Sequence, residues 1–377
     1  MTERSADIDR TGSCGQDRRQ RAETLKTEIV KITDENRDAE EVKNALEKAG
    51  RILQDGGLVA FPTETVYGLG GDALNPASAK KIYAAKGRPS DNPLIVHISR
   101  WEDLALIVKE IPEKAGKLAA AFWPGPLTMI LEKSDRVPEE TTGGLSTVAV
   151  RMPKDKTALS LIRAAGGYVA APSANISGRP SPTLAKYVNE DLGGRIEMIL
   201  DGGQACIGLE STIVDLTVET PTILRPGYIT AEMLEKVLGA VDTDRAILPE
   251  GSAAAPKAPG MKYRHYAPKA ELTIIAGKEE AVIGRINELA KEAEKQGMRS
   301  GVIATDATVG RYRATSVKST GSREKEENAA KELYRILREF DDEGMDVIYS
   351  EAFAESGIGQ AVMNRLLKAA GHRLEEV

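Results

Sequence analysis

The sequence predicts an α/β protein with two domains of unequal size. The chain has 377 residues, and because a domain commonly holds roughly 100–200 residues, about two are expected. Short apolar segments typical of buried strands alternate with segments of helical periodicity along most of the chain. Residues 242–270 interrupt this alternation with an Ala-, Pro- and Gly-rich segment, which is typical of a linker. We therefore expect a larger domain before the linker and a smaller one after it.

Composition and charge are those of a globular protein. Hydrophobic residues make up 41% of the chain and charged residues 29%, and 51 Lys and Arg stand against 57 Asp and Glu, a net charge of −6. These values exclude the collagen-like, wholly disordered and coiled-coil classes. The acidity and an aromatic content of 4% also disfavour a protein whose whole surface binds nucleic acid, but they leave room for a local basic cleft.

The N-terminal segment and the apolar runs bear on location. Residues 1–35 are mostly polar and of mixed charge, so we expect a disordered tail. They lack the apolar region of a signal peptide, and the longest apolar stretch, residues 118–131, is short and contains Pro124 and Pro126. Two cysteines argue against a disulfide framework. We expect a cytoplasmic protein with no membrane contact.

The first domain, residues 36–241, begins with an amphipathic helix over residues 39–57. This helix is expected to end at a Gly-Gly pair. A second helix is expected over residues 75–87, where Asn75 suits the N-cap and Pro76 the first turn. Further periodic segments predict helices over 101–111, 113–123, 157–165, 183–192 and 230–239, and strands over 58–63, 94–99, 127–133, 147–153, 168–174, 198–203, 211–217 and 222–227.

The second domain, residues 271–377, repeats the alternation over a shorter span. Strands are expected over 271–277, 301–306 and 345–352, and helices over 279–296, 326–340 and 357–371. Alternation of this kind is typical of a parallel sheet, so we expect a small Rossmann-like α/β accessory domain.

Two signatures of nucleotide binding give little support. The chain lacks the G-x-x-x-x-G-K-[ST] pattern of a P-loop. Residues 68–73, GLGGDA, match a dinucleotide-binding fingerprint, but no acidic residue ends a strand about 20 residues later, which disfavours that interpretation. The glycines of residues 356–362 are more typical of a tight turn between a strand and a helix.

Two loops carry residue types that bind phosphate. Lys86 and Arg88 flank a glycine at a helix end, where Arg offers a planar fork and Lys a point charge. Ser173 and Asn175 follow a strand in the Ser-, Asn-, Gly- and Pro-rich segment 171–183, whose hydroxyl, amide and backbone N–H groups suit an anion. Basic pairs of this spacing are common by chance, so the first loop is not decisive alone.

Further polar side chains interrupt the apolar strands: Thr63, Glu64, Thr65, His97, Arg151, Glu210, Ser211, Thr212 and Arg225. Each alone is compatible with a structural role, but buried polar groups need partners. Together they concentrate cations and hydroxyls at strand ends of one domain, where α/β folds bind ligands. The linker also holds Tyr263, His265 and Tyr266, a concentration that indicates either ligand contact or a tether packed on a domain surface.

Seven motifs occur in the order found in the YrdC-like family: FPTETVYGLG, KGRPSDNPL, WPGPLT, VAVRMP, APSANISGRPSPT, ESTIVD and LRPG. The resemblance covers residues 36–241, and seven ordered motifs are specific where any one is not. The sequence PGMKYRHYAP and the second domain resemble the longer, two-domain members of the family. The resemblance implies a twisted mixed-sheet catalytic domain, an active-site lid formed by the linker 242–270, and a C-terminal accessory domain.

The resemblance also implies a nucleotidyltransferase that joins L-threonine, bicarbonate and ATP into L-threonylcarbamoyl-AMP and releases pyrophosphate. The implied catalytic residues are Lys86, Arg88, Ser173 and Asn175. They would act by charge and position on an anionic transition state, without a covalent nucleophile. Further implied contacts are Ser90, Thr147, Ser181 and Arg225 with ATP, Thr63, His97, Arg151 and Ser211 with threonine, and Tyr263, His265 and Tyr266 in the lid.

The implied cofactor is Mg²⁺, bound with ATP through phosphates and water, with no dedicated metal ligands from the protein. The implied partner is a transferase complex that passes the threonylcarbamoyl group to the adenosine beside the anticodon of tRNA. One alternative, a carbamoyltransferase of the hydrogenase-maturation type, would need zinc-binding cysteines that the chain lacks. The other is an RNA-binding or ribosome-maturation module, with weak RNA contact and no such catalysis.

Overall fold

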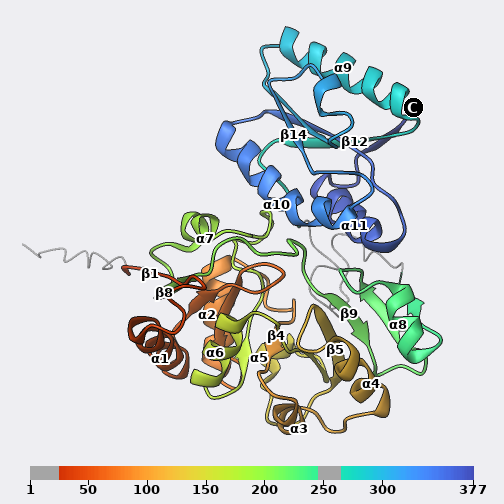
Figure 1. Cartoon of the computed structure of the whole chain (residues 1–377). Helices are drawn as coiled ribbons and strands as arrows, with labels where there is room; N and C mark the ends of the chain where they lie inside the picture. Colours follow the sequence, from red (N-terminus) through yellow and green to blue (C-terminus); the bar gives the residue numbers. More distant parts are fainter. Residues whose placement is uncertain (1–24, 245–264) are drawn as a thin grey trace, which may run out of the picture.

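Two separate sheets divide the protein (Figure 1). The computed structural model describes residues 25–244 and 265–377. Within these ranges, residues 28–243 build a sheet of eleven strands and residues 271–376 a sheet of five. The expected α/β class, a large mixed sheet with a smaller α/β unit, is confirmed. We call the two parts the large unit and the small unit.

The sheet of the large unit follows the order β1-β8-β2-β3-β7-β4-β6-β5-β9-β10-β11. It is mixed, because β6 runs parallel to β4 but antiparallel to β5. Its strands are β1 (Glu28–Lys31), β2 (Val59–Phe61), β3 (Gly68–Asp72), β4 (Ile95–His97), β5 (Leu127–Glu132), β6 (Thr147–Arg151), β7 (Val169–Ala170), β8 (Met198–Asp201), β9 (Thr212–Asp215), β10 (Thr222–Arg225) and β11 (Asp242–Thr243).

The second helix has the predicted caps. The Asn75 side chain accepts a hydrogen bond from the backbone N–H of Ala77 (2.9 Å), and Gly87 ends the helix in the left-handed region at φ 61°, where glycine is favoured. The α-helices of the large unit are α1 (Glu40–Gln54), α2 (Pro76–Lys86), α3 (Leu104–Ile107), α4 (Glu113–Phe122), α5 (Glu139–Thr142), α6 (Lys156–Ala164), α7 (Ala185–Leu192) and α8 (Ala231–Leu238).

The alternation of side chains along β4 and β6 positions the functional site. Val96 and Val150 point into the main hydrophobic core of the large unit. His97 and Arg151 follow them directly and are paired in register, so they point to the opposite face of the sheet. One strand pair therefore serves both the core and the pocket described below.

The small unit has five parallel strands in the order β14-β13-β15-β12-β16. The sequence predicts the parallel arrangement but only three of the strands, and β14 and β16 were not expected. Helix α9 covers the side of this sheet that faces away from the large unit, and α10 and α11 lie on the side that faces it (Figure 1). The elements are β12 (Glu271–Ala276), α9 (Glu279–Lys295), β13 (Ser300–Ala304), β14 (Ser316–Ser319), α10 (Glu326–Glu343), β15 (Val347–Glu351), α11 (Gly357–Ala369) and β16 (Leu374–Glu376).

The described parts of the N-terminal segment and of the linker form strands that the sequence did not indicate. Disorder over residues 1–35 is wrong for residues 28–31, which form β1 and pair in parallel with β8. An edge strand is held by backbone hydrogen bonds and needs few apolar side chains, so composition does not reveal it. At the linker, β11 pairs with β10. Residues 1–24 and 245–264 lie outside the described residues.

Three other segments differ from expectation. The helix expected over 101–111 ends at Ile107, because Val108 is extended and pairs with Lys133. The strand expected over 168–174 shortens to Val169–Ala170, since Pro172 has no N–H for a ladder. The glycines of residues 68–73 lie in strand β3 rather than in a phosphate-binding turn. A Cβ at Gly70 would meet the Phe61 ring at 3.0 Å, so close packing explains this glycine.

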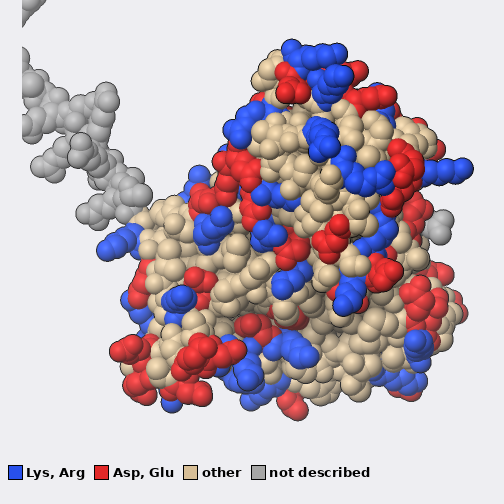
Figure 2. Space-filling model, turned by 45° about the horizontal axis from the view of Figure 1, so that its top comes forward, with Lys and Arg blue, Asp and Glu red and all other residues tan. Residues whose placement is uncertain are grey.

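Charges of both signs are interspersed on the face of the molecule in Figure 2. Exposed ion pairs such as Arg311 with Glu280 and Lys48 with Glu28 occur in both units. A mixed surface of this kind does not favour broad nucleic-acid binding on that face. None of the helices in the described residues is long and apolar enough to cross a membrane.

Candidate active site

One pocket gathers most of the side chains predicted from the sequence. Its walls come from the β2–β3 connection, the end of α2, strands β4 and β6, the loop after β7, the segment just before β9 and the end of β10. The predicted residues that line it are Thr63, Lys86, Arg88, His97, Arg151, Ser173, Asn175, Ser211, Arg225, His265 and Tyr266. Residues distant in sequence thus converge on the face of the sheet to which His97 and Arg151 point.

Three of the implied ATP contacts are not among the pocket-lining residues. Ser90 is exposed in the loop after α2. Thr147 begins β6 while Arg151 ends it, and four strand residues span about 13 Å. Ser181 is buried and donates a hydrogen bond to Glu210 Oε1 (2.6 Å), so it supports the wall of the pocket. Tyr263 lies outside the described residues.

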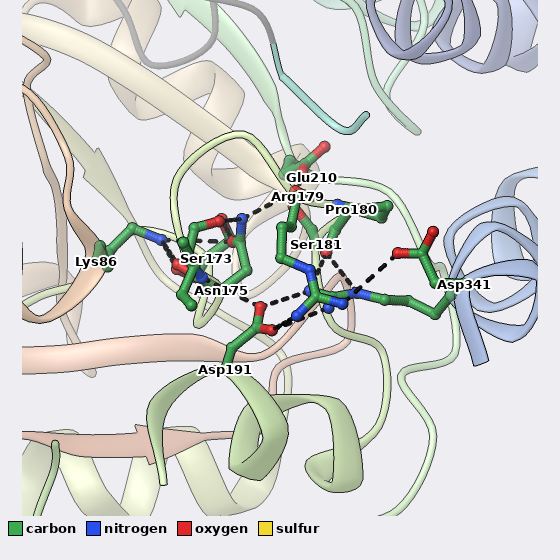
Figure 3. Close-up of polar contacts among 11 residues, drawn as sticks. Lys86, Ser173, Asn175, Arg179, Pro180, Ser181, Asp191, Glu210 and Asp341 are labelled. Atoms are coloured by element: carbon green, nitrogen blue, oxygen red, sulfur yellow. Dashed lines mark hydrogen bonds and ion pairs between the residues drawn. The ribbon is translucent and has the colours of Figure 1, made fainter. Parts of the chain in front are cut away.

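Lys86 binds the loop that carries Ser173 and Asn175. Its Nζ donates to the carbonyl oxygens of Ser173 and Asn175, each at 2.5 Å (Figure 3). The Ser173 hydroxyl donates to Asn175 Oδ1 at 2.5 Å. Burial, with the charge of Arg88 as the next cause, holds the pKa of Lys86 well below its usual range. Lys86 of the Lys-x-Arg motif and both polar residues of the Ser-x-Asn motif therefore form one connected cluster.

Two arginines, the half-buried Arg88 and the buried Arg225, complete the cationic part of the pocket. Arg88 donates to Asn92 Oδ1 (2.6 Å) and Pro93 O (3.1 Å), and burial lowers its pKa to about 10. Arg225, at the end of β10, donates from Nη2 to Ser211 O (2.9 Å), and burial lowers its pKa too. Two guanidinium groups beside the Lys86 ammonium concentrate positive charge in the pocket, which suits an anionic ligand.

A second cluster surrounds Arg151. Its Nη2 pairs with Glu64 Oε1 (2.6 Å), and its Nη1 donates to the Thr65 hydroxyl (2.9 Å). With a long contact from Nε to Gly125 O (3.4 Å), three of the five N–H donors of the guanidinium contact described residues. The others suit a carboxylate ligand, which arginine binds through paired hydrogen bonds.

His97 lies beside Arg151 as a neutral imidazole. It is 4% exposed, and its Nδ1 donates to the carbonyl of Ile95 (3.1 Å). Burial, and next the charge of Arg151, lowers the pKa of His97 to about 3. At neutral pH this histidine is therefore a fixed polar contact and not a general acid.

The depressed pKa of His97 predicts acid-sensitive stability. The folded protein keeps this imidazole neutral until about pH 3, whereas the unfolded chain binds the proton below about pH 6.5. Stability is therefore complete above pH 6.5 and is lost as the pH falls from there toward 3. We expect this one group to cost about 2 kcal/mol between pH 7 and pH 5.

The measurement is chemical denaturation at pH 7 and pH 5. In a His97→Asn protein, the difference in unfolding free energy between the two pH values should shrink by that amount. His372→Asn is the matched control, because His372 is exposed in the left-handed region, φ 63°, which asparagine tolerates. Equal pH dependence in wild type and the His97 variant would refute the assignment.

The small unit supplies contacts to the pocket wall that sequence reasoning missed. Glu210 accepts hydrogen bonds from the Tyr334 hydroxyl (3.0 Å) and from Arg365 Nε (3.2 Å). Burial alone would raise the pKa of Glu210, but the guanidiniums of Arg365 and Arg225 lower it below its usual value. The sequence gives only a weak indication of this contact, which is that Arg365 falls at a buried position of helix α11.

The pocket offers little to a metal ion directly. No group of three or more His, Cys, Asp or Glu side chains within residues 25–244 and 265–377 is placed to hold one. Glu210 is the carboxylate among the described residues that line the pocket, and its oxygens already accept hydrogen bonds from Ser181, Tyr334 and Arg365. The residues present therefore fit a metal bound through its ligand's phosphates and through water, not a dedicated protein site.

Comparisons with known proteins assign the family. Residues 51–227 match the Sua5/YciO/YrdC family model, described as "Telomere recombination". Residues 229–371 match the model described as "Threonylcarbamoyl-AMP synthase, C-terminal domain". Together the two models span nearly all of both units.

Curated relatives and a solved structure agree. A threonylcarbamoyl-AMP synthase of Pyrococcus abyssi is 50% identical over 329 residues, 87% of this chain and 95% of the relative. One of Bacillus subtilis is 49% identical over 87% of this chain and 93% of the relative. The crystal structure of Pyrococcus abyssi Sua5 complexed with L-threonine aligns with a TM-score of 0.86 at 47% identity, covering 93% of this chain and 100% of that one. The similarity runs through both units, and the chain belongs to the Sua5/YciO/YrdC family with the C-terminal domain of threonylcarbamoyl-AMP synthases.

Proposed function

We propose that this enzyme joins L-threonine, bicarbonate and ATP to form L-threonylcarbamoyl-AMP and pyrophosphate. The observation that carries the proposal is that one pocket holds both a polyphosphate-type cation cluster, Lys86, Arg88 and Arg225, and an amino-acid-type cluster around Arg151. Relatives that share both units bear the name of this activity. The product serves the threonylcarbamoyladenosine modification of tRNA beside the anticodon.

The two clusters divide the substrates. ATP phosphates bind Lys86, Arg88, Ser173, Asn175 and Arg225, which supply ammonium, guanidinium, hydroxyl and amide groups on one side of the pocket. The threonine carboxylate binds the guanidinium of Arg151, with contacts from Thr63, His97 and Ser211 on the same sheet face. The proposed Ser90, Thr147 and Ser181 contacts with ATP would need a rearrangement, because these side chains do not line the pocket.

The chemistry needs positioning and charge rather than a protein nucleophile. Condensation of the threonine amine with bicarbonate gives a carbamate and water, a carbamate oxygen attacks the α-phosphorus of ATP, and pyrophosphate leaves. Negative charge builds on phosphate oxygens as the bond to the leaving group breaks, and fixed cations stabilise it. His97 stays neutral and orients substrate. Mg²⁺ would be held by the phosphates and water, and it would neutralise part of the triphosphate charge.

Residues 265–270 support the lid proposed for the linker. The backbone N–H of Ala267 donates to Gly178 O (2.8 Å) in the Ser-x-Asn loop. The Tyr266 ring packs on Tyr334 of α10 with centroids 5.2 Å apart, and His265 also lines the pocket. We propose that His265 and Tyr266 cover the nucleotide and keep water from the labile adenylate. Tyr263, proposed for the same lid, lies outside the described residues.

Omitting substrates one at a time tests the function. We expect pyrophosphate release from ATP and Mg²⁺ to require both L-threonine and bicarbonate. Release at the full rate without threonine would refute the reaction. An RNA-binding module would instead show RNA affinity with a steep dependence on salt and no substrate-dependent turnover.

We further propose a cytoplasmic location and delivery of the adenylate to a tRNA threonylcarbamoyl-transferase complex.

A further inference from the structure

A buried arginine of the small unit contacts segment 176–180 of the large unit, the part of the loop that follows Asn175. Arg338, on α10, has a side chain that is 1% exposed. Its Nη1 and Nη2 donate to the two carboxylate oxygens of Asp191 at 3.0 and 2.7 Å. Its Nε and Nη2 also donate to the carbonyl of Pro180 at 3.0 and 2.6 Å. One guanidinium thus joins helix α10, helix α7 and the loop that follows Asn175.

Asp191 carries this contact into the same loop. Its Oδ2 accepts a hydrogen bond from the backbone N–H of Ile176 (3.1 Å), and its Oδ1 pairs with the guanidinium of Arg179. The segment 176–180 is therefore held at Ile176, at Arg179 and, through Arg338, at Pro180. Figure 3 shows the Asp191 carboxylate pointing from α7 toward the loop, with dashed lines to its partners.

The loop in turn sets the amide of Asn175. Asn175 Nδ2 donates to the carbonyl oxygens of Ile176 (2.8 Å) and Arg179 (2.9 Å). This orientation turns Oδ1 toward the Ser173 hydroxyl (2.5 Å) and Lys86 Nζ (3.4 Å). A shift of segment 176–180 would therefore move the amide, the hydroxyl and the ammonium together.

Stability alone does not account for this arrangement. Burying an ion pair costs desolvation that its attraction only partly returns, and well-packed apolar residues of similar size are often as stable. We infer that Arg338 is a positioning residue: through Asp191 and Pro180 it holds segment 176–180 in the shape that binds ATP phosphates. The inference rests on the proposed function, which places phosphates at Lys86 and Asn175, and it gives the small unit a part in catalysis.

The first test is Arg338→Met in the full chain, with steady-state pyrophosphate release as the readout. We expect kcat/KM for ATP to fall on the order of 10²-fold, the usual result of misplacing a catalytic group by about 1 Å. The affinity for L-threonine, measured by calorimetry without ATP, should stay within about twofold, because the threonine cluster shares no partner with Arg338. Arg338→Lys keeps one charge and should recover part of the loss.

The matched control is Asp342→Asn. Asp342 pairs with Lys186 across the same interface at 3.3 Å, but with side chains 42% and 54% exposed, and we expect kcat/KM within about twofold of wild type. Equal losses for ATP and threonine in Arg338→Met, or wild-type kinetics in that variant, would overturn the inference. If Arg338→Met does not fold, the same two measurements are made on Arg338→Lys. Equal losses of kcat/KM for ATP and of affinity for L-threonine in Arg338→Lys would overturn the inference.

A double variant tests the route through Asp191. If Arg338 acts through that carboxylate, Arg338→Met with Asp191→Leu should lose little more kcat/KM than either single variant. Losses that multiply would mean independent roles and would overturn the proposed route. Failure of the proposed function can be distinguished from failure of this inference. It would appear in the wild-type protein as pyrophosphate release that does not depend on L-threonine.

Discussion

Replacing Lys86 with methionine is expected to lower kcat by on the order of 10²–10³-fold, the usual loss when one preorganised donor to developing charge is removed. Methionine keeps most of the side-chain volume but removes the ammonium that contacts the Ser173 and Asn175 carbonyls. The cation cluster then loses a charge at a buried position, where electrostatic interactions are stronger than in bulk water. The measurement is pyrophosphate release at saturating threonine, bicarbonate and ATP.

Lys80→Met is the matched control for this variant. Lys80 lies on the same helix, α2, but its side chain is 69% exposed and pairs with Glu140 at the surface. We expect its kcat to stay near that of wild type. Full activity of Lys86→Met would contradict the assignment of ATP phosphate binding to Lys86. Unchanged affinity for L-threonine in the same variant would show that the pocket still forms.

Replacing Arg151 with methionine is expected to raise KM for L-threonine by roughly 30-fold or more, which corresponds to about 2 kcal/mol, the low end for truncating a buried charge partner. The residue is 4% exposed, so solvent screens its attraction to a carboxylate only weakly. KM for ATP should change far less, because the phosphate cluster lies on other strands and loops. Steady-state kinetics with each substrate varied in turn measures both values.

Two further variants guard this result. Arg151→Met also leaves the carboxylate of Glu64 without its partner at 2.6 Å, which destabilises a buried charge. Arg151→Lys keeps a positive charge there and should lose threonine affinity with less loss of stability. Arg163→Met, at an exposed position of α6, should leave both KM values unchanged. A rise in KM for ATP that matches the rise for threonine would contradict the division of the pocket.

Local rules predicted the elements whose signals are local. The caps of α2 follow from Asn75, Pro76 and Gly87, and the parallel order of the small unit follows from its strand–helix alternation. Most of the motif residues line one pocket because strand ends on one sheet face converge. Strand β1 could not be predicted in the same way, because its pairing with β8 is made by backbone atoms 170 residues away.

The contribution of the small unit was also beyond sequence reasoning. Arg338 and Arg365 occupy buried positions of α10 and α11, where a charge is unusual, but periodicity does not say which partner each one meets. Asp191 and Glu210 become their partners only when the two units pack together. Ser181 differs in the other direction: its motif predicts contact with ATP, but its hydroxyl donates to Glu210 in the wall of the pocket.

The carbon of bicarbonate tests the central claim most directly. Protein, ATP, Mg²⁺, L-threonine and ¹³C-labelled bicarbonate are mixed, and the adenylate product is analysed by mass spectrometry. We predict an adenylate that contains threonine and one labelled carbon, formed in step with pyrophosphate. An adenylate without the label, or pyrophosphate with no threonine-containing adenylate, would contradict the synthesis of threonylcarbamoyl-AMP in this pocket.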